Sequence, residues 1–334
     1  MKHFGRLCAL GGLAIAAVLF ARQGTSDIVA RVAAAWPGLV AAALFHAVPM
    51  ALNGRAWQVV LPGAKRPRLH EMTLAVWLRG SFNALLPVAR VGGELVAYRV
   101  VRHFGVRRAP AAAGLVVTMA LSLCSQIVFT LLGVALLVGL GRGAGLVDDL
   151  LMGALLMVVV AGAFLAFQRL GAFAVIARIV NGAASGRFGA LLGHSARVDR
   201  AVSAMYRRRA ALAACFGWQT LGWLAGAGEI WLALHFLGHP VGVREALAIE
   251  AIVQAATSVA FAVPGALGVQ EAAFLVVGTA LGIDGPTALA LAASRRLRDA
   301  VVFFPGLLAW HRLERAWSIS AVYFRPATRR MQET

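Results

Sequence analysis

Two glutamates interrupt apolar sequence, and each follows a proline at the same distance. Glu94 comes seven residues after Pro87, and Glu271 comes seven residues after Pro264. Glycines lie between the proline and the glutamate in both copies, at Gly92, Gly93, Gly265 and Gly268. A carboxylate after such a break can bind a proton, a cation or a lipid head group, or it can only cap the half-helix that begins there.

A second group of charges lies in the last apolar segment of the chain. Arg295 and Asp299 are four residues apart, which makes them neighbours on a helix, and Arg298 lies beside both. Arg296 is predicted to face elsewhere. The planar guanidinium suits phosphate and carboxylate groups, so this cluster can hold an anionic head group or pair with one of the two glutamates. Purely structural pairing is the alternative.

Three further ionisable residues are expected at membrane depth, where a charge is costly and tends to be paired or to line a pathway. Glu250 begins a polar stripe that continues four and eight residues later, at Gln254 and Ser258. Glu229 follows a pair of glycines suited to close helix packing, and Arg90 lies between the first proline and its glycines. Hydrogen bonding between helices, without any substrate, explains most of these polar groups equally well.

Motifs of enzymes and of metal sites are missing from the sequence. It contains no Walker-type phosphate loop, no GxSxG and no HExxH. His235 and His239 are four residues apart, but they fall at a helix end before Pro240, which favours an interfacial position over a metal site. The three cysteines lie in apolar runs without a CxxC pair. We therefore expect no metal, no cofactor and no catalytic residue.

The composition is that of an integral membrane protein. Of the 334 residues, 60% are hydrophobic, the mean hydropathy is +0.78 and only 14% are charged. The formal net charge of +18 would suit nucleic acid or an acidic membrane surface. With this hydropathy the membrane surface is the better partner, so no nucleic-acid partner is expected.

The apolar segments predict an all-α, polytopic membrane protein that forms a single transmembrane domain over residues 1–334. About six segments are long enough to span a bilayer: Gly5–Ala21, Ala33–Leu52, Ala111–Leu140, Leu150–Phe167, Ala210–Leu237 and Pro286–Trp310. Two more, Leu69–Phe104 and Glu245–Ile283, are broken at the Pro/Gly sites and are predicted to be re-entrant hairpins. Ordinary helices with kinks are the alternative.

The distribution of arginine predicts how the segments are oriented. Residues 169–209 contain eight arginines and one acid, which places this segment in the cytoplasm together with both termini. Within it, an amphipathic helix is expected either on the membrane surface or packed on the bundle. The two hairpins then enter from opposite sides, so residues 69–140 and 245–310 form an inverted repeat of the kind found in secondary transporters.

Three stretches of the chain carry a family resemblance: Asn83–Glu94, Val263–Glu271 and Arg295–Asp299. They are similar to the lysylphosphatidylglycerol synthase transmembrane region, a flippase-like family. Pro305–Trp310 adds a likeness to its hopanoid-biosynthesis-associated branch. The resemblance implies lipid movement between leaflets, or hopanoid delivery to the outer membrane, without synthase activity. The first copy departs from the family pattern around Arg90, which leaves the role of that residue open.

We therefore expect a multi-pass protein of the bacterial inner membrane that moves or delivers a lipid, a hopanoid or an anionic phospholipid. Proteins of hopanoid biosynthesis or transport are further expected partners. The alternatives are a membrane-embedded lipid-modifying enzyme, with a glutamate as general base, and a non-catalytic scaffold for hopanoid biosynthesis.

Overall fold

The computed structural model describes residues 2–63, 66–86, 91–141, 189–260 and 263–323, and isolated positions between 148 and 166. Helices connected by short turns make up these parts of the chain, and none of the described residues forms a strand. The predicted all-α class of membrane protein is thereby confirmed. The predicted span Leu150–Phe167 lies largely outside the described residues.

The chain bends sharply between its first two helices. Helix α1 (Lys2–Arg22) and helix α2 (Thr25–Ala34) meet at an angle of 88°. Helices α3 (Trp36–Phe45) and α4 (Ala47–Val60) then form one nearly continuous span of 25 residues. The predicted end of this span at Leu52 was wrong.

The span continues past Leu52 because its polar residues find partners inside the protein. The Asn53 side-chain amide donates to the Pro49 carbonyl at 2.8 Å, and the Gln58 amide donates to the Pro67 carbonyl at 2.7 Å. Arg55 in turn donates to Gln58. A helix can carry polar groups through a buried region when each is hydrogen-bonded, so hydropathy alone ended the segment too early.

Two helical hairpins are each followed by a long helix. The first unit consists of α5 (Leu69–Leu85), α6 (Val91–His103) and α7 (Arg108–Gly139). The second consists of α12 (Val243–Val259), a short 3-10 turn η2 (Pro264–Ala266), α13 (Val269–Ala280) and α14 (Gly285–Tyr323). Helix α14 continues beyond the predicted end of the last span at Trp310, as far as Tyr323, with Pro305 inside it.

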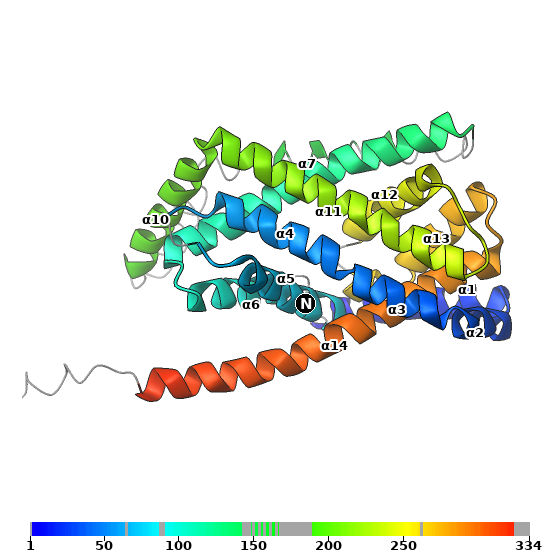
Figure 1. Ribbon diagram of the computed structural model, residues 1–334, viewed down its shortest axis with the longest axis horizontal. Coiled ribbons are helices and arrows are strands. Elements are labelled where there is room, and N and C mark those ends of the chain that lie inside the picture. Colours follow the sequence, from blue (N-terminus) through cyan, green and yellow to red (C-terminus); the bar gives the residue numbers. More distant parts are fainter. Residues whose placement is uncertain are drawn as a thin grey trace, which may run out of the picture.

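The two units are arranged head to tail along the long axis of the molecule. Helices α7 and α14 run in opposite directions, and the α5–α6 and α12–α13 hairpins lie toward opposite ends (Figure 1). Each long helix packs on the other unit, since α7 contacts α12 and α14 contacts α5. The Trp77 indole N–H of α5 donates to the Val302 carbonyl of α14 at 2.8 Å. The hairpins are therefore held across the centre of the bundle.

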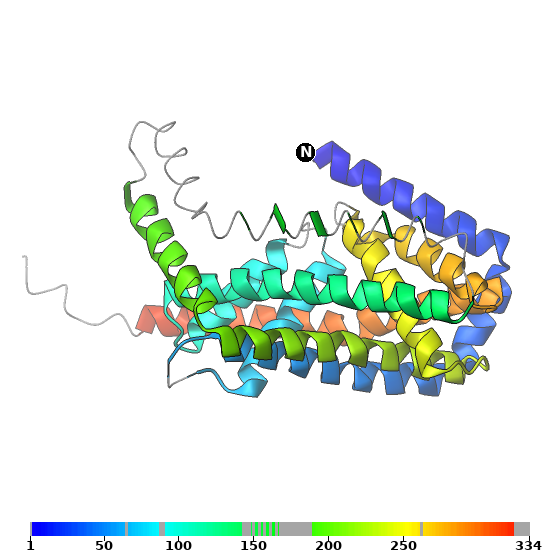
Figure 2. The same ribbon diagram turned by 90° about the horizontal axis from the view of Figure 1, so that it is seen from above.

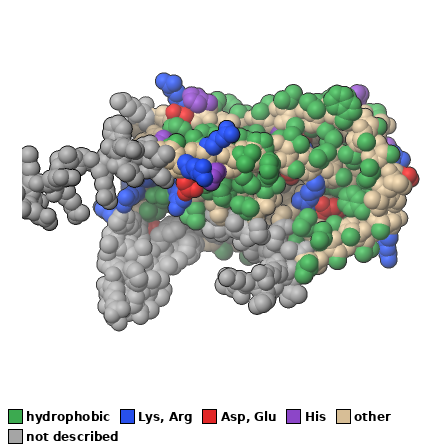
Figure 3. Space-filling model, turned by 90° about the horizontal axis from the view of Figure 1, so that it is seen from below, with side chains coloured by type: hydrophobic (Ala, Val, Ile, Leu, Met, Phe, Trp, Pro, Cys, Tyr) green, Lys and Arg blue, Asp and Glu red, His purple; other side chains and the backbone are tan. Residues whose placement is uncertain are grey.

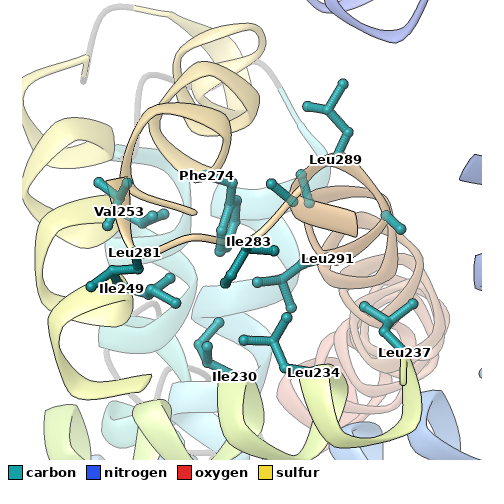
Figure 4. Packing of buried hydrophobic residues seen from close by; sticks show 14 of the residues in the cluster. Ile230, Leu234, Leu237, Ile249, Val253, Phe274, Leu281, Ile283, Leu289 and Leu291 are labelled. Atoms are coloured by element: carbon teal, nitrogen blue, oxygen red, sulfur yellow. The ribbon is translucent and has the colours of Figure 1, made fainter. Parts of the chain in front are cut away.

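Helix α11 (Arg209–Phe236) completes the centre of the bundle beside α4, α7 and α12. At one end, side chains of α11, α12, α13 and α14 interdigitate in an apolar cluster, shown in Figure 4. Its members Leu234, Ile249 and Leu289 are fully buried. A second apolar cluster around Trp57, Leu78 and Val100 lies among α4, α5, α6 and α7. The polar site described below is positioned by helices that these two clusters hold in place.

The arginine-rich connections share one end of the molecule. The Arg208 guanidinium donates to the Val60 carbonyl at 2.9 Å, and Arg99 lies 3.2 Å from the Glu314 carboxylate. Helix α10 (Gly189–Tyr206) lies at this end as well (Figure 2) and buries Val202 and Met205 against the bundle. Over residues 189–206 this amphipathic segment packs on the bundle through Val202 and Met205, and a position on the membrane surface stays a prediction. Residues 169–188 lie outside the described residues.

Many large hydrophobic side chains of the described residues are exposed on the outside of the bundle. In Figure 3 apolar side chains extend along much of the face in view, and charged side chains are gathered in a few places. By length and composition, Trp36–Val60 and Arg108–Gly139 can each cross a membrane, and the bent α1–α2 pair could be a third span. Helices α11 and α14 are 28 and 39 residues long but carry charged residues, which lowers their hydropathy. Six full spans remain a prediction.

Candidate functional site

Three arginines of α14 point to three different helices. The run Arg295-Arg296-Leu297-Arg298 covers nearly one helical turn, so its side chains leave the helix in different directions. Each guanidinium finds a glutamate: Glu250 on α12, Glu271 on α13 and Glu229 on α11. A single turn of α14 therefore ties three neighbouring helices together through buried charges.

Glu250, the partner of Arg295, is the most deeply buried of the three glutamates. Arg295 contacts both carboxylate oxygens, with Nη2 at 3.0 Å from Oε1. Glu250 is 1% exposed, and the Gln254 amide donates to it at 2.8 Å. The guanidinium of Arg295 lies 5.8 Å from the centre of the Phe274 ring. Every polar atom of this carboxylate is thus engaged, which is the arrangement that a charge needs in a dry interior.

Arg298 belongs to a network of four side chains. Its Nη1 lies 2.7 Å from Glu229 Oε2, and its Nε lies 3.2 Å from Asp299 Oδ1. His46, at the junction of α3 and α4, places Nδ1 at 2.7 Å from Glu229 Oε1 and also contacts Arg298 Nη1. The Phe303 ring packs edge-on against His46 at 5.5 Å between centroids. The network joins α3, α11 and α14.

His46 was missed by sequence reasoning. It is a lone histidine in the apolar run from Trp36 to Leu52, and no residue near it in the sequence pairs with it. Its partners are 183 and 252 residues away, so only the fold brings them together. The one available signal was the position of a titratable residue in the middle of a span.

Arg296 and Glu271 form the third pair at the second helix break. Arg296 Nε lies 2.8 Å from Glu271 Oε1, and the same guanidinium donates to the carbonyls of Gly265 and Ala266 at 2.6 and 3.3 Å. Glu271 Oε2 accepts the Gly268 backbone N–H at 2.8 Å. Glu271 therefore caps α13, as the structural alternative predicted, and also carries a charge partner.

One prediction about the arginines was confirmed and another was wrong. Arg296 faces away from Arg295 and Arg298, as predicted, and it is the residue that pairs with Glu271. Arg295 and Arg298 pair with Glu250 and Glu229 rather than with either glutamate that follows a break. The choice of partner depends on how α14 is rotated against α11, α12 and α13, and spacing within one helix does not contain that information.

The second break has the backbone that its glycines allow. Gly265 and Gly268 adopt positive φ values of 60° and 77°, which residues with a side chain rarely tolerate. Pro264 and Gly265 lie in η2, and Gly268 immediately precedes α13. A Cβ placed on Gly265 would lie 3.9 Å from the Ala84 carbonyl near the end of α5. The end of the first hairpin helix thus approaches the second break.

The first break is only partly described. Pro87 and Arg90 lie outside the described residues, and α6 begins at Val91, so Gly92 and Gly93 belong to its first turn rather than to the break. A Cβ on Gly93 would lie 2.4 Å from the Arg79 carbonyl of α5. The absence of a side chain at Gly93 lets α6 approach α5 closely. The role of this glycine is therefore helix packing, where the pattern predicted a break in the helix.

Glu94 is half-buried in the first turn of α6. The Arg79 Nη1 atom lies 3.8 Å from Glu94 Oε2, at the outer limit of an ion pair. That oxygen is buried and has no hydrogen bond within the described part of the chain. Glu94 therefore occupies the place in the first unit that Glu271 occupies in the second, but with a weaker partner.

A small cavity borders the central network between α3, α11 and α14. Its volume is about 20 Å³, room for roughly one water molecule. Glu229, Ser294, Arg295 and Arg298 supply its polar wall, and Leu39, Ala42, Ile230, Ala233 and Leu291 its apolar wall. The Ser294 hydroxyl is buried and has no hydrogen-bond partner among the described residues. The cavity leaves a small space beside the arginines, with polar groups on one wall only.

Comparison with known protein families identifies the family of the chain. The family model for the lysylphosphatidylglycerol synthase transmembrane region matches residues 9–306, which is most of the chain and includes both breaks and the arginines of α14. No curated protein and no solved structure matches the chain. The family predicted from the sequence is confirmed, and the hopanoid-associated branch stays a prediction.

Proposed function

Because the chain belongs to the lysylphosphatidylglycerol synthase transmembrane-region family, we propose that it moves a lipid across a membrane or delivers it from one. The lipid would be a hopanoid or an anionic phospholipid of the bacterial inner membrane, where proteins of hopanoid biosynthesis or transport could be its partners. A general role in membrane lipid biology follows from the family, and transport is the specific step that we add.

One observation carries the proposal: the approach of the two hairpins at the centre of the bundle, beside buried charges. Non-helical backbone at membrane depth is tolerated only inside protein or beside a polar cavity. Here the second break receives two hydrogen bonds from Arg296, and Ala84 of α5 lies next to Gly265. In secondary transporters, paired broken helices from oppositely oriented units surround the substrate site in this way.

The residues that would act on the lipid are the charged side chains of this centre. Arg295 and Arg298 offer the guanidinium geometry that suits a phosphate, and Ser294 adds a hydroxyl donor on the cavity wall. Both arginines are engaged with carboxylates in the structure. A head group would therefore bind by replacing Glu229 or Glu250 as the ion-pair partner of an arginine. These two glutamates would compete with the substrate for the arginines.

The test is lipid exchange between leaflets in liposomes that contain the purified protein. Fluorescent phospholipid and hopanoid analogues are scored by chemical quenching of the outer leaflet. We expect the native protein to accelerate exchange of at least one analogue, and Arg298→Gln to reduce that rate at least about tenfold. Glu314→Gln is the matched control on α14, since Glu314 is exposed and its ion pair within the described part of the chain is with Arg99 at the arginine-rich end.

Rates equal to those of empty liposomes for both analogues would refute transport. Mass spectrometry of the same liposomes separates transport from the alternative of a lipid-modifying enzyme. A new lipid species that forms only with intact protein would replace our proposal by that alternative, whereas unchanged lipids with accelerated exchange support transport.

A further inference from the structure

We propose that His46 is a proton-binding site, and that its protonation releases Arg298 from its contact with the ring. This inference deepens the proposed function: it names the event that would make an arginine available to a lipid head group. The position of one ring nitrogen of His46 supports it. His46 Nδ1 contacts both Arg298 Nη1, which can only donate, and Glu229 Oε1, which as a carboxylate oxygen can only accept.

One nitrogen cannot satisfy both neighbours at once. When Nδ1 carries a lone pair, it accepts a hydrogen bond from Arg298. Nδ1 and Glu229 Oε1 are then two acceptors that face each other without a proton between them. When Nδ1 carries a proton, it donates to Glu229 and its N–H faces the N–H of Arg298. The two protonation states of His46 therefore favour different positions of the guanidinium.

Charged groups from two helices surround His46. From α11 the facing group is Glu229, and from α14 it is Arg298, which Asp299 contacts in turn. The adjoining Arg295–Glu250 pair adds one charge of each sign, and Glu229 and Asp299 also act electrostatically on Arg295. Arg296 of the same helix turns to Glu271 instead. The cluster thus has three carboxylates and two guanidinium groups, and a protonated His46 makes it neutral.

A buried cluster with an unbalanced charge is costly, and a proton is the smallest ion that can balance it. His46 is the group placed to receive it, because its side chain is 17% exposed and lies against both an acid and a base. The protonated ring then pairs with Glu229 and repels Arg298. Asp299 is the partner toward which that guanidinium can move, since Arg298 already contacts Asp299.

The test observes the ring nitrogens directly, without any lipid. Full-length protein with ¹⁵N-labelled histidine in lipid nanodiscs is studied by NMR between pH 5.5 and 8.5. The His46 signals are those that His46→Gln removes. We expect Nδ1 to change from a lone pair to N–H as the pH falls. In Glu229→Gln the ratio of protonated to neutral His46 at one pH should fall about tenfold, because the neighbouring carboxylate is gone.

His235→Gln is the matched control, because His235 lies on α11 stacked on Trp231 and forms no ion pair with an acid among the residues that the structure describes. This change should leave the His46 signals as they are. An Nδ1 that keeps the same protonation state over the whole range would overturn the proposal, as would a titration that is identical in the native protein and in Glu229→Gln.

The consequence for Arg298 is measured in the liposome assay. Exchange by the native protein should be several-fold faster at pH 6 than at pH 8, and His46→Gln should remove this dependence. Equal pH dependence in both proteins would overturn the release of Arg298. If the native protein moves no lipid at any pH, transport fails, while the NMR result still decides whether His46 binds the proton.

Discussion

Arg295 on α14 and Glu250 on α12 contact each other at two points inside the bundle, where Glu250 is 1% exposed. Such a pair is a poor source of net stability, since both charges lose their hydration. The pair contributes to the specificity of packing. Once the two helices are packed, each charge needs the other, because an unpaired charge in the interior is costly. The pair therefore fixes how α14 is rotated relative to α12.

The first prediction concerns this pair. Glu250→Gln leaves the Arg295 guanidinium buried without a counter-charge, and it should destabilise the protein by about 3–5 kcal/mol. Equilibrium unfolding in mild detergent measures the effect. The double variant Arg295→Met/Glu250→Leu is the control, because it leaves no buried charge and should regain most of the loss. If Glu250→Gln lowers the free energy of unfolding by less than about 1 kcal/mol, the expected cost of an unpaired Arg295 is contradicted.

The breaks and the half-helices were predictable from the sequence because their signals are local. Proline and glycine end helices through their own backbone geometry, so Leu69–Phe104 and Glu245–Ile283 matched the observed hairpins to within a few residues. Glu271 also fell where predicted, in the first turn of its helix. Each of these features depends on residues that are near one another in the chain.

The pairing of charges could not be predicted, because it depends on tertiary contacts. His46 meets Glu229 and Arg298 only after α3, α11 and α14 have packed. Gly93 could not be distinguished from a residue of the break, since its role is to let α5 approach α6. Sequence spacing gives the direction of a side chain from its own helix, but not which helix it meets.

The second prediction separates the two roles of Glu271. Glu271→Gln keeps a side chain that can accept the Gly268 N–H but removes the charge that faces Arg296. Glu271→Ala removes both interactions. We expect the alanine variant to be less stable than the glutamine variant by about 1 kcal/mol, the usual contribution of a helix cap. Thermal unfolding in detergent compares them, and equal stability would show that the cap contributes nothing.

The third prediction concerns the close approach of the first hairpin. A Cβ at Gly93 would lie 2.4 Å from both the Arg79 carbonyl and the Asn83 side chain, so Gly93→Ala should destabilise the protein by about 1–3 kcal/mol. Gly217→Ala is the matched control in α11, where a Cβ would meet no atom within 4 Å. That change should be neutral or stabilising by up to about 1 kcal/mol. If both variants unfold at the same temperature, α5 and α6 are not as close as the structure places them.

The last prediction concerns acid stability at the end of the molecule opposite the arginine-rich connections. Asp284, in the turn before α14, accepts hydrogen bonds from the Thr287 backbone N–H at 3.0 Å and from its hydroxyl at 2.6 Å. Partial burial acts to raise the pKa of Asp284, but the bonds from Thr287 and the nearby charge of Arg31 outweigh it and hold that pKa below its usual value.

A lowered pKa in the folded state means that the folded protein binds this proton less readily than the unfolded chain does. The stabilisation by Asp284 is therefore complete above the unfolded value of about 3.9 and is lost as the pH falls from there through the folded value. Asp284→Asn can still cap the helix but no longer titrates. Thermal unfolding at pH 5.5 and pH 3.5 should show a larger loss for the native protein than for this variant. The difference should stay below about 1 kcal/mol, because the Asp284 side chain is 46% exposed and solvent screens its charge. An equal loss in both proteins would mean that Asp284 does not contribute to the acid sensitivity.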